Sequence, residues 1–236
     1  MIANGLFGAQ LNKISEILDG LGLLEDRQTF PNTSLGASDF KGLPYRGVYE
    51  TAVKESAYDF RLADQSLVIF RRAGEDRHNG ELSYSYLECP VEVMPFREFV
   101  ASQVGIPTGH PTFEHLMDQW GDELRPEYEQ YALTLEAKHV VTPIRYDYVA
   151  RDYKPGRHPA SHVHFGFKNE IRVGTNRIML PISFLLFILR QRYPEQWVRF
   201  CAGADAVHIC RNVRQDLDTV DDAYRSTLDN YEIALH

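Results

Sequence analysis

The first apolar pattern along the chain has the period of a helix. Apolar residues recur near the N-terminus at spacings of three and four, and two glycines follow, so an amphipathic helix is predicted over residues 9–24. The residues of this stripe are Leu11, Ile14, Leu18 and Leu21. Residues 25–46 are rich in Pro, Asn, Ser and Gly and are predicted to form a loop.

After this loop the period changes to two. Four segments alternate apolar and polar residues, which is typical of strands. They are YRGVYETAV (45–53), SAYDFRLA (56–63), SLVIFRRA (66–73) and ELSYSYLE (81–88). The dipeptide Asn79-Gly80 before the last segment is a strong turn signal, so an antiparallel meander is predicted.

Helical patterns occupy residues 95–138, which we predict to be a helical insertion. One helix is predicted to begin at Pro95, where a proline suits the first helical position. A second is predicted to be capped by Thr112 and to end at Gly121. A third is predicted to open at Pro126.

The second half of the chain brings three more strand patterns and an unusually apolar helix. The strands are predicted within TPIRYDYVARDY (142–153), SHVHFGF (161–167) and EIRV (170–173). The helix at 181–193 is apolar on nearly every face, which predicts a buried position. A short helix around Trp197 and a C-terminal helix over residues 212–230 follow.

Two groups of strands with helices between and after them predict an α+β fold. We expect one domain over residues 1–236, with six or seven antiparallel strands. The pattern leaves open whether the two groups form one sheet or two.

Composition narrows the class of protein. The 25 Lys and Arg residues against 33 Asp and Glu give a net charge of −8, which disfavours a protein that coats nucleic acid non-specifically. Three cysteines without a CxxC pair favour free thiols in a reducing cytoplasm. The longest apolar run is too short to cross a bilayer, and no Gly-rich nucleotide loop or HExxH motif is present. We therefore predict a cytoplasmic protein with no membrane partner and no nucleotide cofactor.

Candidate chemistry concentrates in the segment GRHPASHVHFG (156–166), which holds three of the nine histidines. Alternate residues of a strand share a face, so His162, His164 and Lys168 are predicted to point one way. The opposite face, turned to the core, is predicted to carry Val163, Phe165 and Phe167.

This part of the chain is also basic. Residues 145–177 contain seven Lys and Arg against three Asp and Glu, a net charge of +4, so the rest of the chain carries −12. A local basic surface with histidines on an acidic protein favours a site for a single phosphate group. The predicted phosphate-binding residues are Arg145, Arg151, Lys154, Arg157 and Lys168.

Three chemistries fit these residue types. The first is metal-free phosphodiester cleavage, in which one neutral histidine removes a proton and a second donates one. Its catalytic candidates are His158, His162, His164 and Asp147.

The second chemistry is a metal site, because two imidazoles on one strand face can bind one ion. Its ligands would come from Asp147, Asp152, His162 and His164, with His208 or Cys210 from a distant segment. The surrounding cations raise the cost of holding a dication, so a tightly bound metal is not expected.

The third chemistry is a magnesium nuclease core built on an (Asp/Glu)-x-Lys pair. Asp152-Tyr153-Lys154 matches the pair, and Asp59 or Glu88 would be the upstream acid. Simpler roles stay open for all these residues: the histidines as polar residues of a strand, Asp147 as a salt-bridge partner, and the His208–Cys210 pair as core.

Several stretches together resemble a bacterial family catalogued as domain of unknown function 2290. They are YDFRLADQSLVIF, ELSYSYLECP, RYDY followed by HPASHVHFG, and LPISFLLFILRQRYP, within roughly residues 45–200. The most specific part is the His-Pro-x-Ser-His-x-His-x-Gly stretch. The resemblance implies a bacterial cytosolic setting and a shared site at these histidines, and it implies no established activity.

These observations predict a phosphodiester-cleaving enzyme, nuclease-like and suited to a bacterial defence or toxin-type system, acting on RNA or DNA. The histidine face is expected to lie in a solvent-accessible cleft with at least two of the five predicted phosphate-binding cations. The alternative is a non-catalytic module that binds a phosphate-bearing ligand or a partner protein through the same surface.

Overall fold

One antiparallel sheet of seven strands forms the centre of the protein. The computed structural model describes residues 4–33, 42–74, 80–168 and 171–229. The strands are β1 (Leu24–Arg27), β2 (Phe60–Leu62), β3 (Leu67–Ala73), β4 (Glu81–Leu87), β5 (Ile144–Val149), β6 (Ser161–Phe165) and β7 (Arg172–Gly174). They lie in sequence order, each antiparallel to the next. The α+β prediction is confirmed, and the two strand groups form one sheet.

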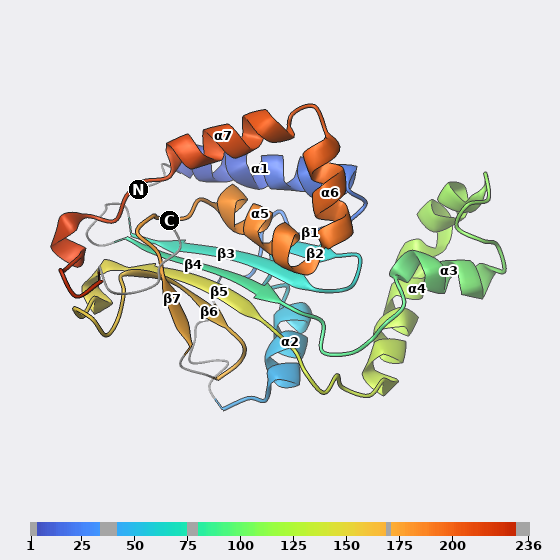
Figure 1. The fold of residues 1–236 in the computed structure, drawn as a ribbon. Helices are drawn as coiled ribbons and strands as arrows, with labels where there is room; N and C mark the ends of the chain where they lie inside the picture. The colour runs from blue at the N-terminus through green and yellow to red at the C-terminus, as the bar shows by residue number, and fades with distance from the viewer. Residues whose placement is uncertain (1–3, 34–41, 75–79, 169–170, 230–236) are drawn as a thin grey trace.

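The helices divide between the two faces of the sheet and one projecting arm. They are α1 (Asn4–Gly20), α2 (Tyr45–Lys54), α3 (Phe96–Val104), α4 (Phe113–Thr134), α5 (Pro181–Arg192), α6 (Pro194–Ala202) and α7 (Ala206–Asp216), with short 3₁₀ turns at Ala150–Asp152 and Asp222–Tyr224. Figure 1 shows α1, α5, α6 and α7 above the sheet, α2 below it, and α3 and α4 as an arm to one side. We call the side of the sheet under α1 and α5 the helix-covered face.

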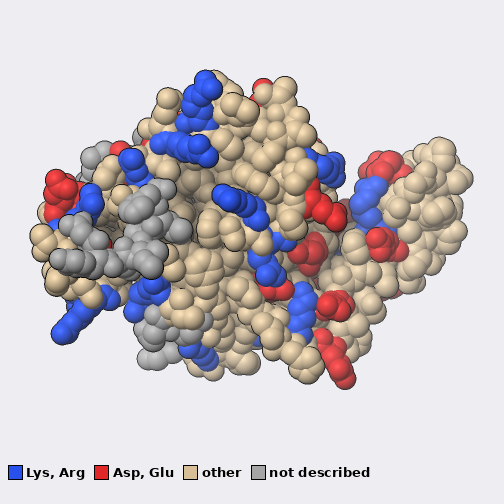
Figure 2. Space-filling view, in the orientation of Figure 1, with Lys and Arg blue, Asp and Glu red and all other residues tan. Residues whose placement is uncertain are grey.

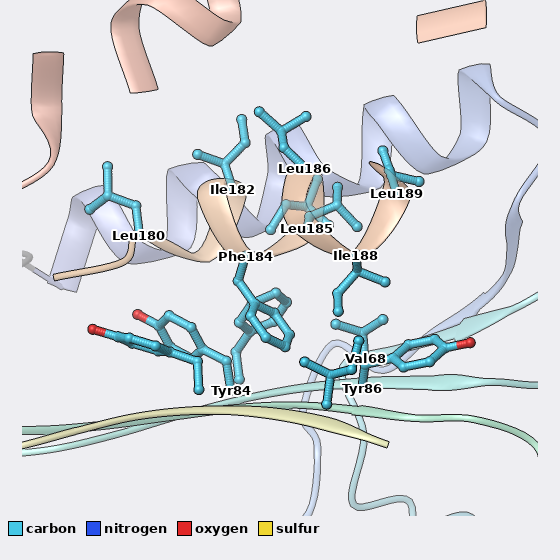
Figure 3. Packing of buried hydrophobic residues seen from close by; sticks show 14 of the residues in the cluster. Val68, Tyr84, Tyr86, Leu180, Ile182, Phe184, Leu185, Leu186, Ile188 and Leu189 are labelled. Atoms are coloured by element: carbon cyan, nitrogen blue, oxygen red, sulfur yellow. The ribbon is translucent and has the colours of Figure 1, made fainter. Parts of the chain in front are cut away.

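Helix α5 lies against the helix-covered face, as its apolar sequence predicted. The Phe184 ring sits 6.1 Å from the Phe70 ring and 5.8 Å from the Tyr84 ring, and Leu185 and Ile188 have no exposed surface. Figure 3 shows Phe184 and Ile188 reaching from the helix toward the strands. Phe187 is only partly buried, so the side of α5 that carries it lies at the edge of the core.

Residues 45–53 were predicted to be a strand, and that prediction is wrong, because they form helix α2. Four buried residues there, Tyr45, Val48, Tyr49 and Ala52, recur at spacings of three, one and three. These positions form an apolar stripe along two turns of a helix. The same segment also alternates in part between apolar and polar residues, which is a pattern typical of a strand.

Two boundaries near the N-terminus also differ from the prediction. The first helix covers Asn4–Gly20 rather than 9–24, and Gly22, with φ of +68°, turns the chain out of it. The predicted loop over 25–46 contains most of strand β1, which pairs with β2. The segment LEDR has no alternating pattern, so its strand conformation comes from backbone pairing rather than from side-chain periodicity.

The arm contains two helices where three were predicted. Helix α4 runs unbroken through Gly121 and Pro126. Gly121 is buried within α4, where a Cβ would lie 3.4 Å from the Met117 Cε atom, and this glycine does not end the helix. Just after the proline, the Tyr128 ring packs 5.0 Å from the Phe96 ring of α3.

The C-terminal helix was predicted over 212–230, but α7 covers Ala206–Asp216 and the described residues after it contain no α-helix. Residues 217–220 run alongside an earlier segment instead. Ile178 N donates to Asp218 O, and Val220 N donates to Asn176 O. These pairings supply the hydrogen bonds that a continued helix would have made. Asn79, half of the predicted turn, lies outside the described residues.

The predicted alternation after His164 ends earlier than expected. Strand β6 stops at Phe165, and Gly166 and Lys168 have φ angles of +86° and +54°, which no strand residue adopts. The Phe167 ring therefore packs 5.4 Å from Tyr45 of α2, not into the core as predicted. Phe165 does face the core, with its ring 6.2 Å from that of Phe187.

Candidate functional site

The face of the sheet away from α1 and α5 carries polar side chains, and we call it the polar face. Its residues are the alternate positions of strands whose other positions build the core: Ser83 and Ser85 lie between Leu82, Tyr84 and Tyr86. The strand register aligns these positions into two rows. One row is Arg71, Ser83, Asp147, His162 and Gly174; the other is Ile69, Ser85, Arg145, His164 and Arg172.

Three side chains from the two rows converge on one point, and we call them the His–Asp cluster: Asp147, His162 and His164. The Nε2 atoms of the two histidines are 2.9 Å apart, and Asp147 Oδ2 lies 3.4 Å from His164 Nε2. One nitrogen or oxygen atom from each residue lies within 4.8 Å of the other two. This is the spacing at which three ligands surround a metal ion, and also the spacing at which neighbouring rings share a proton.

Neighbouring groups hold the orientation of two members, His162 and Asp147. The Pro159 carbonyl oxygen lies 2.9 Å from His162 Nδ1 and accepts a hydrogen bond from its N–H group, which leaves the Nε2 lone pair facing the cluster. Ser83 Oγ donates to Asp147 Oδ1 over 2.9 Å. Arg145 Nε donates to the other carboxylate oxygen over 2.7 Å.

Both histidines are almost fully buried, with 2% of His162 and 8% of His164 exposed. Burial lowers the pKa of His162 to about 4, and the proximity of His164 acts in the same direction. Burial, followed by the charge of Arg145, lowers the pKa of His164. The rings are therefore neutral at neutral pH, and the pair holds no protonated imidazole that could act as a general acid.

One member of the His–Asp cluster, His164, lines a cavity of about 1390 Å³ together with Ser83 and Ser85 of the polar face. The cavity wall also includes two of the predicted phosphate-binding cations, Arg145 and Lys168. Arg71 and Arg172 also line it. These cations have partners within the protein: Arg71 pairs with Asp59, Arg145 pairs with Asp147, and Lys168 Nζ donates to the Leu43 carbonyl.

The cavity is cationic although the whole chain is acidic. Between residues 96 and 134 the chain has seven Asp and Glu against two Arg, so this arm alone carries −5 of the net −8. In Figure 2, acidic side chains gather toward the arm, whereas Lys and Arg are scattered over the rest of the visible surface. The negative net charge therefore says little about the cavity.

Other predicted site residues lie away from the cluster. Arg151 is exposed and pairs with Glu81 over 2.7 Å, while Lys154 and Arg157 are exposed in the turn before β6. Asp152 is exposed in the 3₁₀ turn, so the predicted metal set reduces to three residues. The His158 side chain is half-buried. Its ring lies edge-on to the His162 ring, with 4.9 Å between the ring centroids.

The remaining candidates have partners of their own. Asp59 binds Arg71, and Glu88 pairs with Arg192 over 2.8 Å, so neither acid joins Asp152 in a magnesium core. His208 lies on α7 with its Nε2 atom 2.9 Å from the Asn212 amide, and Cys210 packs against the core.

Sequence reasoning missed Ser83 and Arg172 as members of the site. Both occupy polar positions in alternating segments, which placed them on one face of their own strands. Their proximity to the histidines depends on the pairing of β4 with β5 and of β6 with β7, which the alternation does not specify.

The fold and the cluster define an α+β protein with a polar, histidine-bearing sheet face. The chain belongs to the family described as Uncharacterized conserved protein (DUF2290), whose model matches residues 25–228. No curated protein and no solved structure matches the chain. Within the described residues, no helix has both the length and the apolar character needed to cross a membrane.

Proposed function

We propose that this protein hydrolyses phosphodiester bonds and that the His–Asp cluster activates the attacking water. The observation that carries the proposal is that His164 and Arg145 are cross-strand neighbours in the wall of one cavity. A phosphate held there would meet the activating group and a cation at once, which is the arrangement that positioning and charge stabilisation require.

The reaction adds water across one P–O bond. The water oxygen bonds to phosphorus, its proton is removed at the cluster, and the leaving oxygen departs as an alcohol after taking a proton from solvent. Arg145, Arg172 and Lys168 would stabilise the charge that develops on the phosphoryl oxygens. We further propose that the substrate is RNA or DNA, in a cytoplasmic nuclease of a bacterial defence or toxin-type system.

A non-catalytic module that binds a phosphate-bearing ligand or a partner protein is the second candidate. It is favoured by the low pKa of both histidines, which leaves the pair without a general acid. The cations of the cavity can hold an anion whether or not any bond is broken.

The experiment compares cleavage by wild type and His164→Ala. Bis(p-nitrophenyl) phosphate, single-stranded RNA, single-stranded DNA and duplex DNA would be incubated with the protein, both with EDTA and with added divalent metals. We expect wild type to cleave at least one of them and His164→Ala to do so at least ~100-fold more slowly.

The matched control is His208→Ala, the same substitution at an exposed histidine of α7, and it should cleave at the wild-type rate. A folded His164→Ala protein with the full rate would refute the proposal. No cleavage by wild type on any substrate, together with measurable binding of phosphate or oligonucleotide, would establish the binding module instead.

A further inference from the structure

We propose that the His–Asp cluster is a binding site for one divalent transition-metal ion, with Asp147 Oδ2, His162 Nε2 and His164 Nε2 as its protein ligands. Metal binding can be measured without a substrate, so this site stands or falls separately from the proposed cleavage. Only its use in catalysis rests on the proposed function.

The interatomic distances fit a shared ion. Two nitrogens each about 2.1 Å from an ion, and 2.9 Å from one another, subtend an angle of about 90° at it. The separation of 3.4 Å between His164 Nε2 and Asp147 Oδ2 corresponds to about 110° at the same bond length. Both angles lie in the range that tetrahedral and octahedral ions adopt.

The hydrogen bonds around the cluster are those that metal ligands need. The Nδ1–H group of His162 donates a hydrogen bond to the Pro159 carbonyl oxygen, and this fixes the tautomer whose Nε2 atom carries no proton. Asp147 is held on its other oxygen by Ser83, so Oδ2 keeps lone pairs for Arg145 and for an ion.

A second observation comes from His158. Its ring lies edge-on to His162 at 4.9 Å, and its Nδ1 atom is buried without a hydrogen-bond partner. A buried nitrogen without a partner is costly unless something binds it.

Two imidazoles and one carboxylate leave positions open on an ion, and His164, one of the three ligands, lines the cavity. This ligand set suits Zn²⁺, Mn²⁺, Fe²⁺ or Co²⁺ better than Mg²⁺ or Ca²⁺, which prefer oxygen ligands. An open position can hold a water molecule and lower its pKa, or accept an oxygen of a phosphate group.

The density of cations, which argued against a metal on sequence grounds, weighs less in the structure. Arg151, Lys154 and Arg157 are exposed outside the cavity wall. The charge of Arg145 is matched by Asp147 at 2.7 Å. The competing occupant of the cluster is a single proton on His164 Nε2, shared between His162 Nε2 and Asp147 Oδ2.

The experiment titrates the purified full chain, stripped with a chelator and dialysed, with Zn²⁺, Mn²⁺ and Co²⁺ in a calorimeter. The visible spectrum of the Co²⁺ form reports the coordination directly. We expect one ion per chain for wild type and for His208→Ala, and at least ~100-fold weaker binding for His164→Ala and Asp147→Asn. Circular dichroism and thermal melting show whether each variant is folded.

Binding of no ion by folded wild type would overturn the proposal in favour of the shared proton, whatever the variants do. Equal binding by wild type and a folded His164→Ala protein would overturn it by placing the ion elsewhere. One ion per chain without cleavage of any substrate would leave the metal site standing and refute the proposed function. Cleavage that is unaffected by chelation, in a protein that binds no ion, would support the proposed function and refute the metal site.

Discussion

The two faces of the sheet are built by the same strands yet have opposite chemistry. On the helix-covered face, Tyr84 and Tyr146 pack with Phe184 of α5. On the polar face, Ser83 and Asp147 are paired positions of the same two strands. Burial of apolar area stabilises the fold by roughly 25 cal/mol per Å², whereas a hydrogen bond contributes only about 1 kcal/mol net. The first face therefore holds most of the stability, and the second is free to carry chemistry.

The largest effect on stability is expected at the centre of the helix-covered face. Leu185→Ala should lower the free energy of unfolding by about 2–5 kcal/mol, since the side chain is fully buried and its loss leaves a cavity. Phe187→Ala should cost less, because Phe187 is only partly buried. Urea unfolding monitored by circular dichroism checks both, and losses below about 0.5 kcal/mol at both positions would place α5 at the periphery.

The next prediction separates the two faces within one strand, by changing neighbours in β6. Val163→Ala should cost roughly 2 kcal/mol, because Val163 is fully buried on the helix-covered face, while metal binding and cleavage stay unchanged. His164→Ala should abolish metal binding and cleavage while changing the stability less than Val163→Ala does. Denaturant unfolding and metal titration of both variants test this. Loss of metal binding in Val163→Ala at full folding would show that the faces are not independent.

A polar group buried on the helix-covered face should have an intermediate effect. The Tyr146 hydroxyl accepts a hydrogen bond from Met179 N over 2.9 Å and lies 3.0 Å from Ser161 Oγ. Tyr146→Phe leaves the Met179 N–H without this acceptor, so a loss of about 1–3 kcal/mol is expected. Thermal unfolding measures it, and an unchanged midpoint would mean that water replaces the hydroxyl.

The comparable deletion on the polar face should lower the stability less and the metal affinity more. Ser83→Ala removes one hydrogen bond to Asp147, at about 1 kcal/mol or less. Since Ser83 orients a proposed ligand, metal affinity should fall by about 10–100-fold while the stoichiometry stays at one ion. Calorimetric titration of the variant checks this positioning role. Unchanged affinity would show that Arg145 orients Asp147 without help.

The smallest effect is expected outside both faces. Arg151→Ala removes an exposed ion pair with Glu81, so stability should change by no more than about 0.5 kcal/mol. Metal binding should be unaffected, and phosphodiester cleavage should fall by less than about twofold, because the exposed Arg151 is not part of the cavity wall. A large loss of cleavage would extend the substrate site to the turn before β6, where Lys154 and Arg157 also lie.

Predictions from the sequence were reliable for features that depend on a single helix or strand. The buried helix at 181–192, the strands around Tyr84, Tyr146 and Val163, and the shared face of His162 and His164 all follow from local period. The pattern failed where packing overrode it. Residues 45–53 carry two periods at once, and α4 continues through Pro126, next to the packing of Tyr128 on Phe96 of α3.

By itself, the sequence determined which side chains of each strand share a face, because successive strand residues point to opposite sides. It therefore placed His162 with His164, and Arg145 with Asp147, each pair on its own strand. Only the tertiary structure decided that these pairs meet. The pairing of β5 with β6 sets Asp147 opposite His162, and the pairing of β4 with β5 across the whole α3–α4 arm brings Ser83 to the same carboxylate. The alternating pattern excludes a register shift of one residue, because such a shift would turn the core side chains outward. Which partners the strands have, and which of the remaining registers they adopt, depends on how the sheet packs against its helices.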